Sequence, residues 1–263
     1  MPIREGEYVY LLDPSGKRIW LRAEPKMLKI ASLGTMDGTK VVGAEEGAVI
    51  SVAGREYTVF RPGAVELISS LDRGAQIITP KDAATILMHC DIKAGDTVLE
   101  VGAGSGGLTT ALLNAVAPTG RVHTVEFKDE NIQRTSRNLR RTGLDLHWGS
   151  TLGDARAVSL SDIEADALVM DMPDPWLALD NLARHLRPGG RFCAYVPNAN
   201  QAEATVNALR ERGFAEVHAL ENLQRGLEVH PGGVRPSFEM LGHTGYLIFA
   251  RKRGPSAESG ASV

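Results

Sequence analysis

The segment 98–109, VLEVGAGSGGLT, joins an apolar strand, a carboxylate, a glycine-rich turn and the start of a helix. Gly102, Gly104 and Gly106 leave the backbone open, because a Cβ at these positions would block a ligand lying on the loop. The helix expected from Gly107 directs its free N–H groups at the same space. This pattern predicts a site for a nucleotide-type cofactor.

Two cofactors fit such a site, and a ligand-free β–α turn is the structural alternative. Gly102, Gly104 and Gly107 satisfy the G-x-G-x-x-G fingerprint of NAD sites, with Glu126 about 20 residues downstream. Glu100 favours S-adenosylmethionine, because a carboxylate there would crowd a pyrophosphate but can accept hydrogen bonds around a cationic aminoacyl group. The G-x-G-x-G spacing and an acidic, Pro-rich loop after the fourth expected strand favour the same cofactor.

Length and composition are those of a globular protein with one ordinary domain and one small one. The chain has 263 residues, 43% hydrophobic and 23% charged. No apolar run approaches the roughly 18 residues of a membrane span, and the N-terminus lacks the apolar core of a signal peptide. We therefore expect a cytoplasmic protein with no membrane partner and no metal site.

The net charge of −3 argues against a general nucleic-acid binder but allows a local basic patch. Arg134, Arg137, Arg140 and Arg141 follow helical spacing and form a basic stripe, for which a solvated helix face is the simpler interpretation. Cys90 and Cys193 lie in apolar patterns typical of buried thiols, and a disulfide stays open from the sequence.

The chain divides into three parts. Residues 1–65 contain short β runs separated by turn residues and predict a small β-rich domain. Residues 66–253 alternate strands and helices, and we expect them to form the catalytic domain. Residues 254–263 are small and polar and predict a disordered tail.

The alternation predicts a doubly wound α/β sheet of Rossmann-like type. The strands expected before the last helix span 96–101, 121–126, 144–148, 165–171 and 191–196. Two final strands, 214–220 and 245–252, have no helix between them and predict an antiparallel pair at the sheet edge. Ligands of such sheets bind beyond the carboxyl ends of the strands, so the residues after each strand are the informative ones.

Two carboxylates follow the second and third expected strands. Glu126 can accept hydrogen bonds from two ribose hydroxyls of an adenosyl group. Asp154, in the polar loop that follows, can accept the adenine amino group, although an ordinary loop aspartate explains it nearly as well.

Asp171 ends the fourth strand in the sequence DMPDPW. Methyl transfer to an exocyclic amino group often uses Asn or Asp followed directly by Pro-Pro and an aromatic residue, and Met172 and Asp174 interrupt that pattern. An ionised Asp171 suits a ring nitrogen that becomes cationic as it attacks, because the carboxylate stabilises the developing charge. A helix-capping role is the alternative.

Amide side chains after the fifth strand predict contacts with a base edge. Asn198 and Gln201 are the candidates, whereas an N-cap role explains Asn200. His243, before the last strand, is a further substrate candidate, with a structural loop histidine as the alternative.

Five segments together resemble the tRNA (adenine-N1)-methyltransferases of the TrmI family, which modify an adenine in the T-loop. They are QIITPKDAATI, VLEVGAGSGGLT, VMDMPDPW, YVPNANQ and GHTGYLIFARK, and the likeness extends over nearly the whole chain. The resemblance implies a homotetramer, a tRNA substrate and a catalytic role for Asp171. It implies cofactor contacts at Ser105, Gly106, Gly107, Leu108, Glu126, Asn131 and Asp171.

The chain departs from the family at two positions. Thr79 stands where members often carry Tyr or His, and the acidic position after the third strand aligns with either Ser150 or Asp154. The alternatives are a methyltransferase for a protein or small molecule, an NAD-dependent oxidoreductase, and a catalytically silent tRNA-binding subunit. The glycine loop together with Asp171 argues against the silent subunit.

Overall fold

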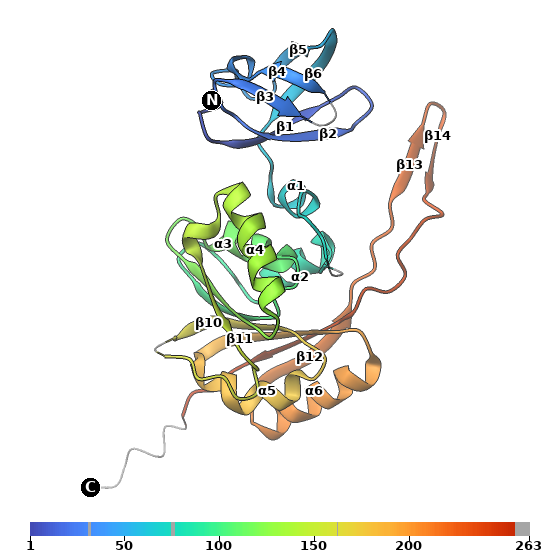
Figure 1. Ribbon diagram of the computed structural model, residues 1–263. Helices are drawn as coiled ribbons and strands as arrows, with labels where there is room; N and C mark the ends of the chain where they lie inside the picture. The colour runs from blue at the N-terminus through green and yellow to red at the C-terminus, as the bar shows by residue number, and fades with distance from the viewer. Residues whose placement is uncertain (31–32, 75–76, 162, 256–263) are drawn as a thin grey trace, which may run out of the picture.

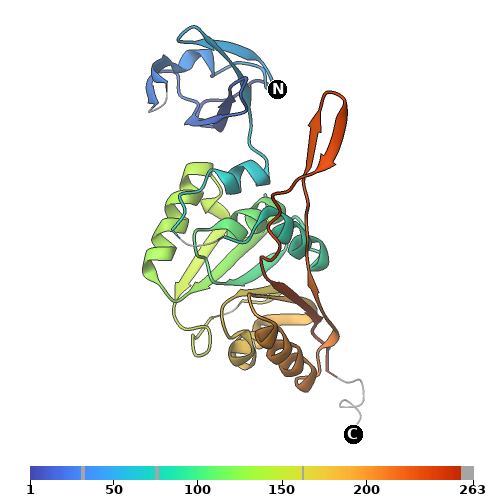
Figure 2. The ribbon, with the colours of Figure 1, turned by 90° about the vertical axis from the view of Figure 1, so that its right-hand side faces the viewer.

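The computed structural model describes residues 1–30, 33–74, 77–161 and 163–255. A small β region lies at one end, an α/β domain follows it, and a long two-stranded arm projects beside both (Figures 1 and 2). The segment of the expected disordered tail from residue 256 onward lies outside the described residues.

The N-terminal β region has a four-stranded antiparallel sheet in the order β2-β1-β6-β5. Its alternating sequence buries one face, which includes Val9, Leu11 and Val59. The strands and the accompanying hairpin are β1 (Tyr8–Leu12), β2 (Arg18–Arg22), β5 (Val49–Val52), β6 (Arg55–Phe60), β3 (Met27–Ile30) and β4 (Gly34–Asp37), with a 3-10 turn, η1 (Gly38–Lys40).

The second domain contains a seven-stranded sheet in the order β12-β15-β11-β10-β7-β8-β9. Its strands are β7 (Thr97–Val101), β8 (Arg121–Glu126), β9 (Trp148–Leu152), β10 (Ala165–Asp171), β11 (Leu186–Val196), β12 (Ala215–Glu221) and β15 (Tyr246–Arg251). The five strands from β7 to β11 are parallel, and β15 pairs antiparallel with both β11 and β12. This is the doubly wound, Rossmann-like architecture that the sequence predicts, with an antiparallel strand (β15) beside the parallel strand β11.

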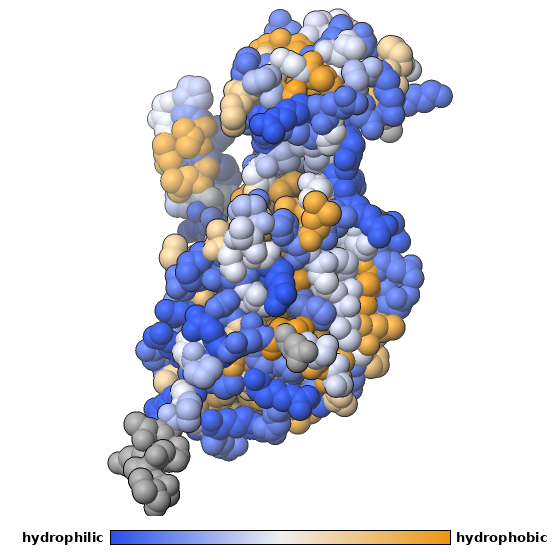
Figure 3. All heavy atoms as spheres, turned by 90° about the vertical axis from the view of Figure 1, so that its left-hand side faces the viewer, coloured by the Kyte–Doolittle hydropathy of each residue, from blue (hydrophilic) through white to orange (hydrophobic). Residues whose placement is uncertain are grey.

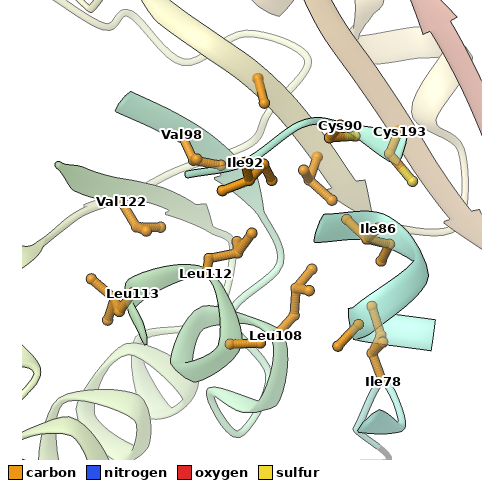
Figure 4. Close-up of a cluster of buried hydrophobic side chains, with 14 of the residues drawn as sticks. Ile78, Ile86, Cys90, Ile92, Val98, Leu108, Leu112, Leu113, Val122 and Cys193 are labelled. Carbon is orange, nitrogen blue, oxygen red and sulfur yellow. The ribbon is translucent and has the colours of Figure 1, made fainter. Parts of the chain in front are cut away.

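Helices cover both faces of the sheet. On one face lie α1 (Ala64–Ser69), α2 (Pro80–His89), α3 (Gly107–Val116) and α4 (Asp129–Thr142); on the other lie α5 (Pro175–Leu182) and α6 (Ala199–Glu211). Figure 4 shows Leu108, Leu112 and Leu113 of α3 among strand residues such as Val98. Because both faces are covered, the central strands are almost continuously apolar.

Cys90 and Cys193 lie beside each other in this core and are free thiols (Figure 4). No helix among the described residues is long and apolar enough to cross a membrane.

The third parallel strand differs from the expected one. Residues 145–147 form a 3-10 turn, η2 (Asp145–His147), and β9 begins only at Trp148. The sequence predicts a strand over 144–148, but the structure has a turn there and Leu146 is 86% exposed. β9 is an edge strand whose side chains are only partly buried, so its polar sequence carries no apolar signal.

Two local features and three elements differ from what the sequence predicts. The sequence predicts a β run at Val41-Val42 and a turn at 187–190. Val41 instead lies in a turn after η1, and 187–190 lie within β11 at a register shift. The short helix α1 and the hairpin β3–β4 carry weak periodic patterns. The arm consists of β13 (Leu227–His230) paired with β14 (Gly233–Pro236), and it lies between β12 and β15 along the sequence. Both strands of the arm are largely exposed, so neither has the buried face from which a strand can be predicted.

Candidate active site

A pocket of about 470 Å³ lies at the carboxyl ends of β7, β8, β9 and β10. Its position beside the switch between β7 and β10 is where parallel sheets bind ligands. It is lined by Val101, Gly102, Gly104, Val125, Glu126, Phe127, Lys128, Asn131, Gly153, Asp154, Ala155, Arg156, Asp171, Met172, Pro173 and Asp174.

Gly102 and Gly104 shape the floor of this pocket. Both adopt positive φ, +88° and +53°, a region that other residues rarely occupy. A Cβ at Gly102 would clash with the carbonyl oxygen of Asp171, so the absence of a side chain lets the loop lie against the end of β10. A Cβ at Gly104 would meet no atom within 4 Å, so the space beside this residue is open.

Glu126 connects the glycine loop to the end of β8. Its Oε2 accepts hydrogen bonds from the backbone N–H groups of Ala103, at 2.9 Å, and Gly104, at 3.3 Å. Its Oε1 accepts from the N–H of Lys128 at 2.8 Å. The carboxylate is therefore fixed in orientation while lining the pocket.

Asp171 brings a second carboxylate to the pocket. Among the described residues, none donates a hydrogen bond to it. Burial, together with the charge of Glu126, raises the pKa of Asp171 to about 7. A cationic ligand group placed here would favour the ionised form, so the pair of carboxylates is suited to a positive charge.

Asp154 lies in the pocket, whereas Ser150 lies within β9 opposite Thr124. The Asp154 carboxylate accepts from the Nε and Nη2 of Arg156, at 2.9 and 2.8 Å. These hydrogen bonds hold the pKa of Asp154 below its ordinary value. Asp154 is therefore an acceptor held in place, the property that an adenine amino group requires.

Glu100 does not line the pocket but is fully buried beneath the first turn of α3. It accepts hydrogen bonds from the hydroxyls of Thr109, at 2.8 and 3.0 Å, and Thr124, at 2.6 Å. Burial raises the pKa of Glu100 to about 8, despite these hydrogen bonds. Its geometry supports a positioning role under the loop.

The rest of the glycine loop is mostly buried. Asn131, from α4, lines the pocket, whereas four other predicted contact residues do not: Ser105, Gly106, Gly107 and Leu108. The Ser105 hydroxyl accepts from the N–H of Gly74 at 3.0 Å, and its carbonyl accepts from Asn138 at 3.0 Å. These contacts fasten the loop to neighbouring elements.

Asn198 and Gln201 begin α6 and lie outside the pocket lining. Asn198, and not Asn200, is the N-cap, and its N–H donates to Oε1 of Gln201 at 3.1 Å. Nε2 of Gln201 donates to the carbonyl of Pro173 at 2.8 Å. Their described contacts are those of a capping pair that also fixes the loop after Asp171.

His243 joins two segments beyond the sheet edge. Nδ1 lies 2.6 Å from Oε1 of Glu221, and Nε2 lies 2.8 Å from the carbonyl of Pro197. Both partners are acceptors, so together they raise the pKa of His243 and favour the form with two N–H groups. The ring also lies 4.9 Å from that of Tyr246, so only its other face is left for a substrate.

The arrangement can bind a nucleoside-like ligand with a cationic group and orient a second reactant at Asp171. Among the described residues, no three His, Cys, Asp or Glu side chains gather to hold a metal. The pocket itself offers carboxylates, the glycine loop, the Phe127 ring and the side chains of Lys128 and Arg156.

Comparison with known proteins identifies the family. Residues 63–232 match the family model described as tRNA methyltransferase complex GCD14 subunit. The chain is 32% identical to a tRNA (adenine(57)-N(1)/adenine(58)-N(1))-methyltransferase TrmI of Methanocaldococcus jannaschii, over 93% of this chain and 94% of that protein. The chain belongs to this methyltransferase family.

Solved structures of similar fold are also methyltransferases. A SAM-dependent O-methyltransferase from Thermotoga maritima has a TM-score of 0.82 and 30% identity, covering 97% of this chain and 96% of that one. The tRNA (m1A58) methyltransferase TrmI of Aquifex aeolicus has a TM-score of 0.77 and 27% identity, covering 97% and 100%. The cofactor of this family and fold is S-adenosylmethionine, which decides against NAD.

Several residues lining this methyltransferase pocket were missed in the sequence. Phe127, 70% exposed, directly follows Glu126 and offers a ring for stacking. Its place immediately after a strand was the available signal. Lys128 and Arg156 gave no such signal, because isolated surface cations look alike in sequence.

Proposed function

We propose that this protein transfers a methyl group from S-adenosylmethionine to the N1 ring nitrogen of an adenine in the T-loop of tRNA. The main support is the position of Asp171: its carboxylate lines the cofactor pocket, and none of the described residues donates a hydrogen bond to it. The curated names of the relatives support the substrate class.

The pocket residues fit S-adenosylmethionine. Glu126 is placed for the ribose hydroxyls, Asp154 for the adenine amino group, and Phe127 for stacking. Asp171 and Glu126 supply negative charge for a sulfonium or an ammonium group. We assign Gly102, Gly104 and Asn131 to the same site, while Glu100 and the loop residues 105–108 support it from below. When bound, the cofactor supplies an electrophilic methyl group.

Asp171 acts on the substrate. N1 of adenine gives its lone pair to the new bond, and the ring acquires positive charge as it reacts. The carboxylate stabilises that charge and accepts a hydrogen bond from the neighbouring amino group, which orients the base. Asn198 and Gln201 act indirectly, by fixing the loop after Asp171, and His243 offers its ring face to the base.

We further propose a cytoplasmic homotetramer that binds tRNA, built from a β domain (1–65), a catalytic domain (66–253) and a tail (254–263). The arm supports self-association, because Leu227, Val229 and Val234 on it are 65%, 70% and 63% exposed. Figure 3 shows these apolar atoms as an orange group on the projecting arm. A paired set of exposed apolar side chains is typical of an interface between subunits.

The test is methylation of an unmodified tRNA transcript with labelled cofactor, followed by mass spectrometry of nuclease fragments. We expect 1-methyladenosine in the T-loop fragment. Because the Thermotoga protein is named as an O-methyltransferase, small-molecule and protein substrates are assayed in parallel with tRNA. Labelling of those substrates and not of tRNA would overturn the proposal.

A further inference from the structure

A ladder of aromatic rings and guanidinium groups covers the outer face of the N-terminal sheet. The Arg18 guanidinium lies 5.6 Å from the Tyr10 ring centroid, and Tyr10 lies 5.2 Å from Trp20. Trp20 stacks on Tyr8 with centroids 5.6 Å apart and planes at 12°. The guanidinium of Arg141, from α4, completes the ladder 5.8 Å from Tyr8.

The ladder follows from strand register. Tyr10 and Trp20 are directly opposite each other on β1 and β2, and Phe60 is opposite Tyr10 on β6. Alternation places them on the face opposite the buried Val9 and Leu11. Three neighbouring strands thus carry aromatic side chains in a row outside the main core cluster of the small domain. Tyr10 is buried between its neighbours, whereas the rings beside it are partly exposed.

Arg22 fixes this face relative to α4. Its Nη2 donates to the carbonyls of Arg140 and Arg141, at 3.0 and 3.2 Å, at the C-terminal end of the helix. A cation is favoured there because the last carbonyls carry partial negative charge. The aromatic ladder and the arginine stripe of α4 are therefore one continuous surface.

The cations of this surface are mostly free of carboxylates. Arg18 lies 3.7 Å from Glu66. In the part of the chain that the structure describes, no carboxylate lies within 4.0 Å of Arg22, Arg137, Arg140 or Arg141. Arg137 and Arg140 are exposed. Along β2, a groove of about 480 Å³ is lined by the cations Arg18, Arg22 and Lys29, by Trp20 and by one carboxylate, Glu24, among others.

We infer that the tRNA substrate docks on this surface, with backbone phosphates along Arg137 and Arg140 and an unpaired base or sugar against Trp20. The inference rests on the proposed function and specifies where the protein binds its tRNA substrate. Free guanidinium groups beside stacked rings match RNA, whose phosphates pair with arginine and whose bases stack on aromatic rings. In a chain of net charge −3, such a patch has to be local.

A second copy of this chain is the less suitable occupant. The exposed apolar side chains gather on the arm, and both ribbon views place the arm away from α4 (Figures 1 and 2). The ladder, by contrast, adjoins the exposed Arg137 and Arg140, which have no carboxylate within 4.0 Å among the described residues and therefore favour a polyanion.

The experiment compares the double variant Arg137→Gln/Arg140→Gln with the control Arg210→Gln/Arg253→Gln. The control removes two exposed charges as well, one of them on α6 across the sheet. Binding of an unmodified tRNA transcript is measured by fluorescence anisotropy over a range of salt, S-adenosylmethionine binding by calorimetry, and mass by light scattering. Trp20→Phe tests the ladder while keeping a ring.

For the stripe variant we expect affinity to fall on the order of 10-fold and the slope of log K against log salt to lose about 2, since each phosphate contact contributes about 1. The control should match wild type. Trp20→Phe should weaken binding by less, with the slope unchanged, because stacking is not ionic.

Two results would overturn the docking surface while leaving the proposed function intact. One is salt-dependent wild-type binding with an unchanged slope in the stripe variant. The other is a changed mass in that variant, which would identify the surface as a subunit interface. If wild-type protein bound no tRNA at all, the proposed function itself would fail.

Discussion

At the scale of single residues, the proposed mechanism depends on Asp171. Replacing it with Ala should lower the methylation rate by a factor on the order of 10² to 10⁴, the range for a positioned charge or acid–base group. Asp171→Asn should lie in between, because it keeps hydrogen bonding and loses the charge. Single-turnover kinetics on tRNA would measure both. Asp180→Asn, on a 77% exposed side chain paired with Arg212, is the control. Near-normal turnover in Asp171→Ala would refute the mechanism.

The pKa of Asp171 predicts how rate depends on pH. Burial and the charge of Glu126 raise it to about 7, so the carboxylate required for catalysis forms only as pH rises through that value. The rate should therefore increase toward pH 7 and level off above it. A bound sulfonium should move the midpoint below about 7, because it favours the charged form. In Asp171→Asn this rise should vanish; a rise of equal size there would assign the titration to another group.

The residues of the pocket were only partly accessible from sequence. Strand-end reasoning singled out Glu126, Asp154 and Asp171, which all line it, because parallel strands bring their carboxyl ends together. It could not separate Glu100 from them, since a carboxylate beside a glycine loop looks the same whether it faces ligand or Thr109. Whether the Glu100 side chain faces the ligand or α3 depends on which face of β7 it lies on, and the sequence does not show this.

Gly104 belongs to the scale of the loop as an element. Gly104→Val should abolish S-adenosylmethionine binding, because the residue has a φ of +53° and its new side chain would occupy the open space. Calorimetry measures the affinity. Gly213→Val is the control, since Gly213 also has positive φ and open space but follows α6. Folded Gly104→Val protein with unchanged affinity would remove the loop from the cofactor site.

The arm predicts the behaviour of another element. Val229 and Val234 are cross-strand partners, so both project from one face. Val229→Ser/Val234→Ser should shift the proposed tetramer toward smaller species, measured by light scattering after size exclusion. Val65→Ser, at an exposed position on α1, is the control. A tetramer that persists at low concentration in the double variant would place the subunit interface elsewhere.

Elements with a buried periodic face could be predicted, and those without one could not. β7 is buried on both sides and α3 is buried over most of its length, so both have apolar sequence patterns that predict them. β9, at the sheet edge, and the arm, in solvent, have sequences that tertiary pairing alone turns into strands. The displaced third strand has the same cause, because no buried face in the sequence marks where β9 begins.

Stability is a property of the whole molecule, and Glu100 makes it depend on pH. Its pKa, ordinarily 4.5, is about 8 in the fold, so the folded state binds the proton more tightly than the unfolded one. The free energy of unfolding should therefore fall as pH rises from about 4.5 to 8. Denaturant melts of Glu100→Gln should show a smaller fall. Asp171→Asn is compared in parallel, because Asp171 contributes with the same sign. An identical pH slope in Glu100→Gln and wild type would contradict this.

Helix α4 also sets a length. Asn131, near its start, lines the cofactor pocket, and Arg141, near its end, lies over Tyr8 of the other domain. Ten residues of α-helix span about 15 Å, and Arg22 closes the far end. For an RNA docked as proposed above, the anchor at one end of α4 would lie at a fixed distance from the methyl donor at the other end. The helix would then act as a ruler along the RNA, selecting the nucleotide that reacts by distance as well as by shape.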